Sequence, residues 1–127
     1  MALERGSNGL RIAHYVVVKT VQLAIHDFGY AQALRNELLR DGGHEVYLVE
    51  KPDLKRDGVV VLDEKGLDSL NTLSESIAER LVVIARKGAD HLAQLWRAGI
   101  RHVVFEKDSS RTAQMAVLAL ELRLSDN

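Results

Sequence analysis

Two aspartates follow apolar runs that are typical of buried strands. Asp63 comes directly after the run at residues 59–62, and Asp27 comes shortly after the run at residues 23–25. Uninterrupted apolar runs indicate strands covered on both faces, as in a parallel sheet. The carboxyl ends of such strands meet at the edge where open α/β sheets bind their ligands. Because carboxylates at one edge can hold a divalent cation, Asp27 and Asp63 are candidate metal ligands.

The composition excludes several classes of function. The chain has 127 residues, of which 46% are hydrophobic and 28% charged, and it carries a net charge of −1. These values are typical of a single globular domain, and they give no field that attracts nucleic acid or an anionic membrane. The absence of cysteine excludes disulfides, zinc thiolates and thiol catalysis. The apolar runs are far shorter than the roughly 20 residues of a membrane span.

The beginning of the chain shows no secretion signal. Residues 1–10 lack an apolar core, and we expect a disordered or expression-derived tail there, with a cytoplasmic location by default. Residues 11–127 are expected to form one domain. Within it, residues 11–20 are strand-like and predict an extension of the first strand, an extra strand or an arm.

Short apolar runs alternate with helical patterns along the chain, as in a parallel sheet flanked by helices. The pattern predicts strands at residues 21–25, 45–49, 59–62, 81–84 and 102–105. Helical spacing predicts helices at 30–40, 67–77, 90–97 and 110–124, and in the third of these Trp96 is expected to pack against the sheet. The link at 50–57 contains Pro52 and is too short for a full crossover helix, so the second helix should be truncated.

A second interpretation of the first strand remains open. The strand could run from Tyr15 to Lys19 instead of from Val21 to Ile25, with a long helix from residue 20 to residue 40. Gly29 would then lie inside that helix at a cost of roughly 1 kcal/mol. This alternative would move Asp27 away from the sheet edge.

Several segments resemble the receiver domain of bacterial two-component response regulators. The segments that carry the resemblance are residues 24–27, 34–39, 43–46, 59–63, 81–85 and 98–100, and the match covers residues 21–124. The resemblance implies a three-layer α/β sandwich with a five-stranded parallel sheet in the flavodoxin-like strand order. It also implies that Asp63 is the acceptor of a phosphoryl group from a histidine kinase. Asp27 matches the second of two acids that hold Mg²⁺ in that family, but His26 stands in place of the first.

Three further positions of the implied pocket matter for activity. Ala85 stands where the family has a threonine or serine, and Glu106 stands where it has a lysine, with Lys107 one residue along. Phosphoryl transfer to a carboxylate needs a cation and positive charge near the phosphoryl oxygens. The sequence therefore predicts a degenerate receiver that is neither phosphorylated nor an enzyme and that needs no cofactor, with Mg²⁺ bound only if the pocket is active.

Other interpretations of these residues stay open. The chain could be an atypical active receiver phosphorylated on Asp63, or a small flavodoxin-like ligand-binding domain or enzyme. Asp27 could instead cap the helix that follows it, and Asp63 could simply open a polar loop. The remaining histidines show no metal-ligand spacing and are expected at the surface or at strand ends; they are His14, His44, His91 and His102.

The last predicted helix carries two apolar stripes. One stripe should face the sheet and consists of Ala113, Val117, Leu120 and Leu124. The other lies roughly opposite and consists of Met115, Leu118 and Leu122. Exposed apolar patches usually mark interaction sites, so we expect a protein partner or a second copy on this helix.

Overall fold

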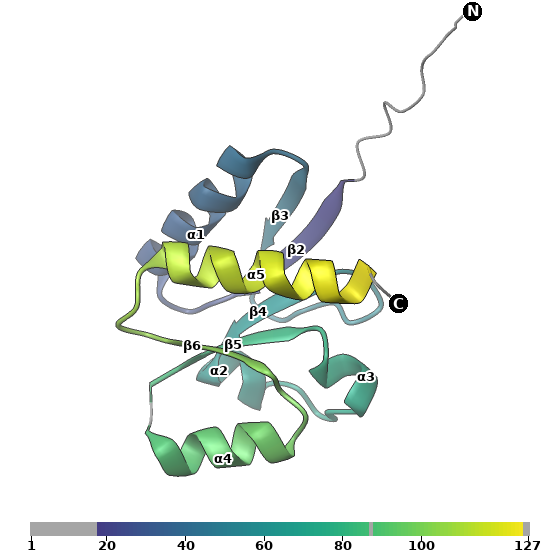
Figure 1. Ribbon diagram of the computed structural model, residues 1–127, viewed down its shortest axis with the longest axis vertical. Coiled ribbons are helices and arrows are strands. Elements are labelled where there is room, and N and C mark those ends of the chain that lie inside the picture. Colours follow the sequence, from purple (N-terminus) through teal and green to yellow (C-terminus); the bar gives the residue numbers. More distant parts are fainter. Residues whose placement is uncertain (1–17, 87, 126–127) are drawn as a thin grey trace, which may run out of the picture.

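The computed structural model describes residues 18–86 and 88–125, and their five strands form one fully parallel sheet (Figure 1). The spatial order is β3 (His44–Leu48), β2 (Lys19–Ala24), β4 (Val59–Asp63), β5 (Leu81–Ala85) and β6 (His102–Phe105). Numbered along the described chain, this is the order 2-1-3-4-5 of flavodoxin-like folds. The predicted fold class is therefore confirmed.

Helices cover both faces of the sheet. On one face lie α1 (Phe28–Asp41) and α5 (Ser110–Ser125), which contact each other and pack on a core that includes Leu34, Val61 and Val117 (Figure 1). The short helices α2 (Glu64–Asp68) and α3 (Glu75–Ala78) share the other face with α4 (Ala89–Arg97). These layers form the predicted three-layer sandwich.

The first strand follows the first of the two interpretations. Residues 19–24 form β2, so Lys19 and Thr20 extend that strand; the other residues of the predicted tail and arm, except Val18, lie outside the described residues. α1 begins only at Phe28, which places Gly29 in the first turn. The alternative with a long helix from residue 20 to residue 40 is therefore wrong, and Asp27 stays at the edge of the sheet.

The helix predicted at residues 67–77 is also wrong, because it is divided into α2 and α3. Asn71 and Thr72 lie between the two helices, and both residue types are poor helix formers. The Ser74 side chain then accepts a hydrogen bond from the Ile77 N–H and starts α3 as its N-cap. The apolar residues that suggested one helix do share a function in packing, because they all contact the same core; they are Leu67, Leu70, Leu73 and Ile77.

The second crossover helix, which was predicted to be truncated, is absent, and a loop takes its place. No helix occurs between Leu48 and Val59. The buried side chain of Gln22 exchanges two hydrogen bonds with the backbone of Asp53, at 2.9 Å and 2.7 Å. The Arg80 guanidinium donates to carbonyl groups of the same segment, those of Leu54, Arg56 and Gly58. These side chains thus satisfy backbone groups that a helix would otherwise have paired.

His44 lies at the end of a strand, as expected, but it is not a surface residue. Its side chain is 4% exposed, and its Nε2 lies 3.0 Å from both carboxylate oxygens of Glu121, which is 7% exposed. The contact joins the first residue of β3 to α5. Glu121 lies four positions after the buried Val117 and so shares its face, which explains why a polar residue reaches the core side of the helix.

Candidate functional site

A hollow in the described structure lies at the carboxyl ends of the strands. From β2 the chain continues to β3 on one side of the sheet, and from β4 it continues to β5 and β6 on the other side. The strand order therefore reverses between β2 and β4, and ligands of open α/β sheets bind at such a switch point. The hollow has a volume of about 610 Å³ and is lined by Ile25, His26, Asp27, Tyr30, Asp63, Glu64, Lys65, Asp68, Ile84, Arg86 and Glu106.

This hollow brings together four of the predicted pocket residues, namely His26, Asp27, Asp63 and Glu106. Ala85 is buried and lines a smaller neighbouring hollow of about 370 Å³ instead, and so does Lys107. The predicted pocket is therefore divided between two adjacent depressions.

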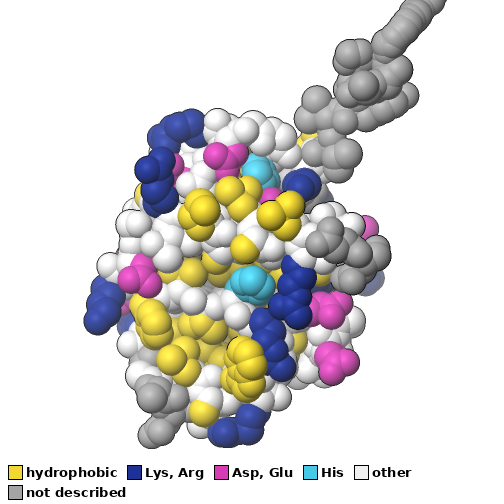
Figure 2. All heavy atoms as spheres, in the orientation of Figure 1, with side chains coloured by type: hydrophobic (Ala, Val, Ile, Leu, Met, Phe, Trp, Pro, Cys, Tyr) yellow, Lys and Arg dark blue, Asp and Glu magenta, His cyan; other side chains and the backbone are white. Residues whose placement is uncertain are grey.

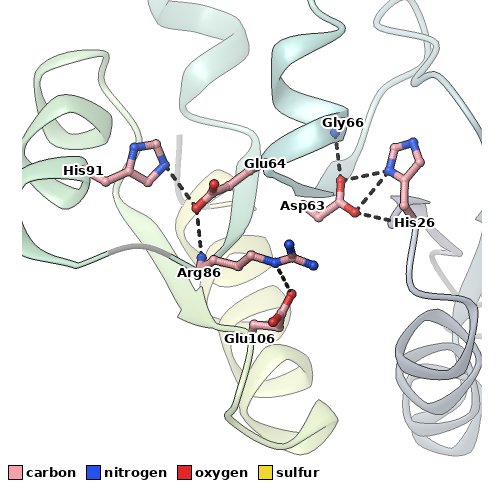
Figure 3. Close-up of polar contacts among 7 residues, drawn as sticks. All are labelled: His26, Asp63, Glu64, Gly66, Arg86, His91 and Glu106. Atoms are coloured by element: carbon pink, nitrogen blue, oxygen red, sulfur yellow. Dashed lines mark hydrogen bonds and ion pairs between the residues drawn. The ribbon is translucent and has the colours of Figure 1, made fainter.

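Asp63 ends β4 and is also the N-cap of α2. Its Oδ1 accepts a hydrogen bond from the Gly66 N–H at 2.7 Å, and its Oδ2 accepts one from the His26 N–H at 2.7 Å (Figure 3). The His26 ring adds a contact from Nδ1 at 3.0 Å and 3.1 Å to the two oxygens. Both carboxylate oxygens thus have donors within the protein.

The close approach of α2 to β2 depends on Gly66. A Cβ atom at this position would lie 2.6 Å from the Ala24 carbonyl oxygen, which is too close for any side chain. Glycine therefore lets the first turn of α2 bring its N–H group to Asp63 beside the end of β2.

The surroundings of Asp63 act on its pKa in opposite directions. Burial, the largest single influence, raises the pKa, but the hydrogen bonds from His26 and Gly66 and the charge of His26 together outweigh it. The pKa of Asp63 consequently lies below its ordinary value. The carboxylate is held in its charged form by the Gly66 N–H, which it caps, and by His26.

This lowered pKa predicts an acid-dependent contribution to stability. Because the folded-state pKa lies below that of the unfolded chain, the ionised Asp63 stabilises the fold above about pH 4, and the contribution is lost as the pH falls through the folded-state value. We expect Asp63→Asn to cost more free energy of unfolding at neutral pH than in acid, measured by urea titration at several pH values. Asp57→Asn, at an exposed site, is the matched control. A cost for Asp63→Asn that does not change with pH would contradict the prediction.

Asp27 caps the following helix. Its Oδ1 accepts a hydrogen bond from the Tyr30 N–H at 3.0 Å, in the arrangement expected of an N-cap aspartate. Among residues 18–86 and 88–125, no three His, Asp or Glu side chains are grouped in a way that could hold a metal ion. Asp27 and Asp63 line one hollow, and their pairing as metal ligands stays a prediction.

Arg86 is a pocket residue that the sequence analysis missed. It follows β5, and its Nε donates a hydrogen bond to Glu106 Oε2 at 2.7 Å (Figure 3). That hydrogen bond and the charge of Glu106 raise the pKa of Arg86. Glu106 therefore does not present an unopposed negative charge where the resemblance calls for a lysine. A charged residue two positions after the strand predicted at 81–84 was the signal that could have revealed Arg86.

Glu64 links the pocket to the loop after β5. Its Oε2 accepts a hydrogen bond from the Arg86 N–H at 2.8 Å and lies 3.2 Å from His91 Nε2 on α4 (Figure 3). The carboxylate thus joins the end of β4 to the start of α4. Tyr30 is a further lining residue that the sequence did not reveal; burial, with a smaller effect of the Asp108 charge, raises the pKa of its hydroxyl.

The second apolar stripe of α5 is exposed at two of its three positions. Met115 is 59% exposed and Leu122 is 65% exposed, whereas Leu118 is partly buried. Figure 2 shows apolar side chains over both α5 and α4 on the viewed face of the molecule. We refer to Met115, Leu118 and Leu122 as the outer stripe of α5.

The prediction that Trp96 packs against the sheet is wrong. Its side chain is 60% exposed, because the preceding residue, Leu95, takes the position that faces the core. The Arg101 guanidinium lies 3.9 Å from the centre of the indole ring and donates to the Trp96 carbonyl oxygen. Trp96 therefore belongs to the surface near β6.

The fold and the hollow define an open α/β domain of flavodoxin-like topology with a polar depression at its switch point. Comparison with family models, with curated proteins and with solved structures gave no match. Within the described residues, no helix has the length and apolar character required to cross a membrane.

Proposed function

We propose that this chain is a degenerate receiver domain, a regulatory module of bacterial signalling that acts by protein contacts and not by catalysis or by an aspartyl-phosphate switch. The observation that carries the proposal is the state of Asp63. Its two oxygens accept hydrogen bonds from the His26 and Gly66 N–H groups and contact the His26 ring, which stabilises the carboxylate and makes it a weaker nucleophile toward a phosphoryl group.

Three neighbouring positions support the proposal. Ala85 is buried and has no hydroxyl that could move toward a phosphoryl group. His26 replaces an acid that would help to hold Mg²⁺, a hard cation that prefers oxygen ligands. The Arg86 guanidinium, which could neutralise a phosphoryl group, is already paired with Glu106.

The output of such a module would come from its surface. The outer stripe of α5 offers exposed apolar side chains at Met115 and Leu122, which fit a protein partner or a second copy of the chain. In this proposal the module works in the cytoplasm and requires no cofactor. Neither a membrane nor nucleic acid is a partner.

The proposal is tested with a phosphoryl analogue. We expect the amide NMR spectrum to show no saturable shifts when Mg²⁺ and beryllofluoride are added, because binding would have to compete with the hydrogen bonds that His26 and Gly66 donate to Asp63. A dilution series in the same spectra should move the amides of Met115 and Leu118 if that stripe binds a second copy. Asp63→Asn serves as the control for specific binding.

The second candidate is an atypical active receiver, which is favoured by the presence of Asp27 and Asp63 in one hollow. Saturable shifts centred on Asp63 and lost in Asp63→Asn would support this candidate and overturn the first. Mg²⁺ would then be the cofactor and a histidine kinase the partner. A small-molecule ligand or substrate in the 610 Å³ hollow is the remaining alternative.

A further inference from the structure

The two edge strands of the sheet, β3 and β6, differ in whether their outward-facing N–H and C=O groups have hydrogen-bond partners. On β6, the Phe105 N–H donates to Asp108 Oδ2 at 3.1 Å, and the Phe105 carbonyl accepts from the Asp108 N–H at 2.9 Å. Asp108 thereby pairs both backbone groups of Phe105, the last residue of β6. Such capping is one way in which proteins prevent an exposed edge from pairing with another chain.

β3 has no such protection among the described residues. The Gly43 carbonyl and the Val49 N–H bond to β2, at 2.8 Å and 3.0 Å, which fixes the odd-numbered residues as those that face β2. His44, Val46 and Leu48 therefore direct their N–H and C=O groups to the open side, where no described strand lies. Figure 1 shows β3 at the margin of the sheet.

The surroundings of β3 favour an apolar contact at this edge. Leu48 is 40% exposed on β3, and Leu39 is also an exposed apolar side chain on the adjoining helix α1. The absent crossover helix removes an element that could have shielded β3, because the loop at 49–58 is fastened to Gln22 and Arg80 nearer the centre of the sheet.

We propose that β3 pairs in antiparallel fashion with β3 of a second copy of this chain, around a two-fold axis at Val46. In this register Val46 lies opposite its own copy and His44 lies opposite Leu48, so each opposed pair can exchange both backbone hydrogen bonds. Glu45 of one copy then lies opposite Tyr47 of the other, so no like charges meet across the interface. The two sheets become one continuous sheet.

This surface is distinct from the outer stripe of α5, so the inference does not rest on the proposed function. Leu48→Lys tests it, because a lysine on an edge strand opposes pairing and the exposed site tolerates the change. Leu122→Lys on α5 is the matched control, since it makes the same substitution at another exposed leucine. Sedimentation of the full chain should show that Leu48→Lys weakens self-association by on the order of tenfold or more, because both copies lose buried apolar area.

A second measurement tests the register. The chain has no cysteine, so Glu45→Cys and Tyr47→Cys each introduce a single thiol. Their Cα atoms would lie about 4.5 Å apart across the pair, within the range that a disulfide spans. An oxidised mixture of the two variants should form disulfide dimers faster than either variant alone.

Three results would overturn the inference. One is a mixture that cross-links no faster than the single variants. Another is self-association that is lost in Leu122→Lys and kept in Leu48→Lys, which would place the contact on α5 alone. The third is a monomer in which the amides of His44, Val46 and Leu48 are protected from hydrogen exchange, because another segment of the same chain would then cover the edge.

Discussion

Gly58→Ala is expected to lower the free energy of unfolding by on the order of 3–5 kcal/mol. Gly58 has φ +114°, a conformation that residues with a Cβ rarely adopt. A Cβ atom there would lie 2.2 Å from the Thr20 carbonyl oxygen and 3.1 Å from its carbon. Thr20 belongs to β2 and Gly58 immediately precedes β4, so relief of the clash would separate the two central strands.

Thermal unfolding of the two proteins checks this prediction. A loss of this size should lower the melting temperature by at least about 10 °C in a domain of this length. Gly88→Ala is the matched control, because φ is −87° at Gly88 and nothing lies within 4 Å of an added Cβ. An equal loss in both variants would show that the contact with Thr20 is not the cause.

The middle of the sheet could be predicted from the sequence because β4 and β5 contain uninterrupted apolar runs. Residues 59–62 and 81–84 are buried on both faces, and both lie in the strands that the runs predicted. α1 could be predicted equally well, because Ala31, Leu34 and Leu38 have helical spacing and are its buried positions, and Gly42 is its C-cap. Local pattern and tertiary structure agree at these places, which is why the inference succeeded.

The helical pattern at residues 67–77 failed for a physical reason. Apolar spacing reports which side chains reach the core, and Leu67 and Ile77 do reach it. It does not report whether the backbone between them stays helical. The N-cap at Ser74 was visible in the sequence and would have divided the segment, because a capping serine starts a helix and does not continue one.

The candidate site was predictable only in part. The rule that ligand sites lie at strand ends placed Asp27 and Asp63 at one edge, and both line the hollow. The contact of Asp63 with His26 was not predictable, because it joins residues that are 37 positions apart. The same holds for Gln22, whose place in an apolar run gave no sign that it fastens a loop.

Glu121→Ala is expected to lower the free energy of unfolding by about 2–3 kcal/mol, because it leaves a buried donor of His44 without an acceptor. The His44 Nδ1 atom is buried and has no partner, so Nε2 is the ring nitrogen that donates to Glu121. The contact is the polar link between β3 and α5. Its loss should lower the melting temperature by roughly 8–15 °C.

Glu121→Gln is the informative companion of this variant. The glutamine carbonyl can still accept the hydrogen bond from His44 Nε2, so we expect a loss of less than about 1 kcal/mol. Chemical unfolding of both variants at neutral pH measures the difference. If Gln and Ala cost the same, the carboxylate charge and not the hydrogen bond holds β3 to α5. If neither has a cost, the buried pair contributes specificity without stability, as some buried ion pairs do.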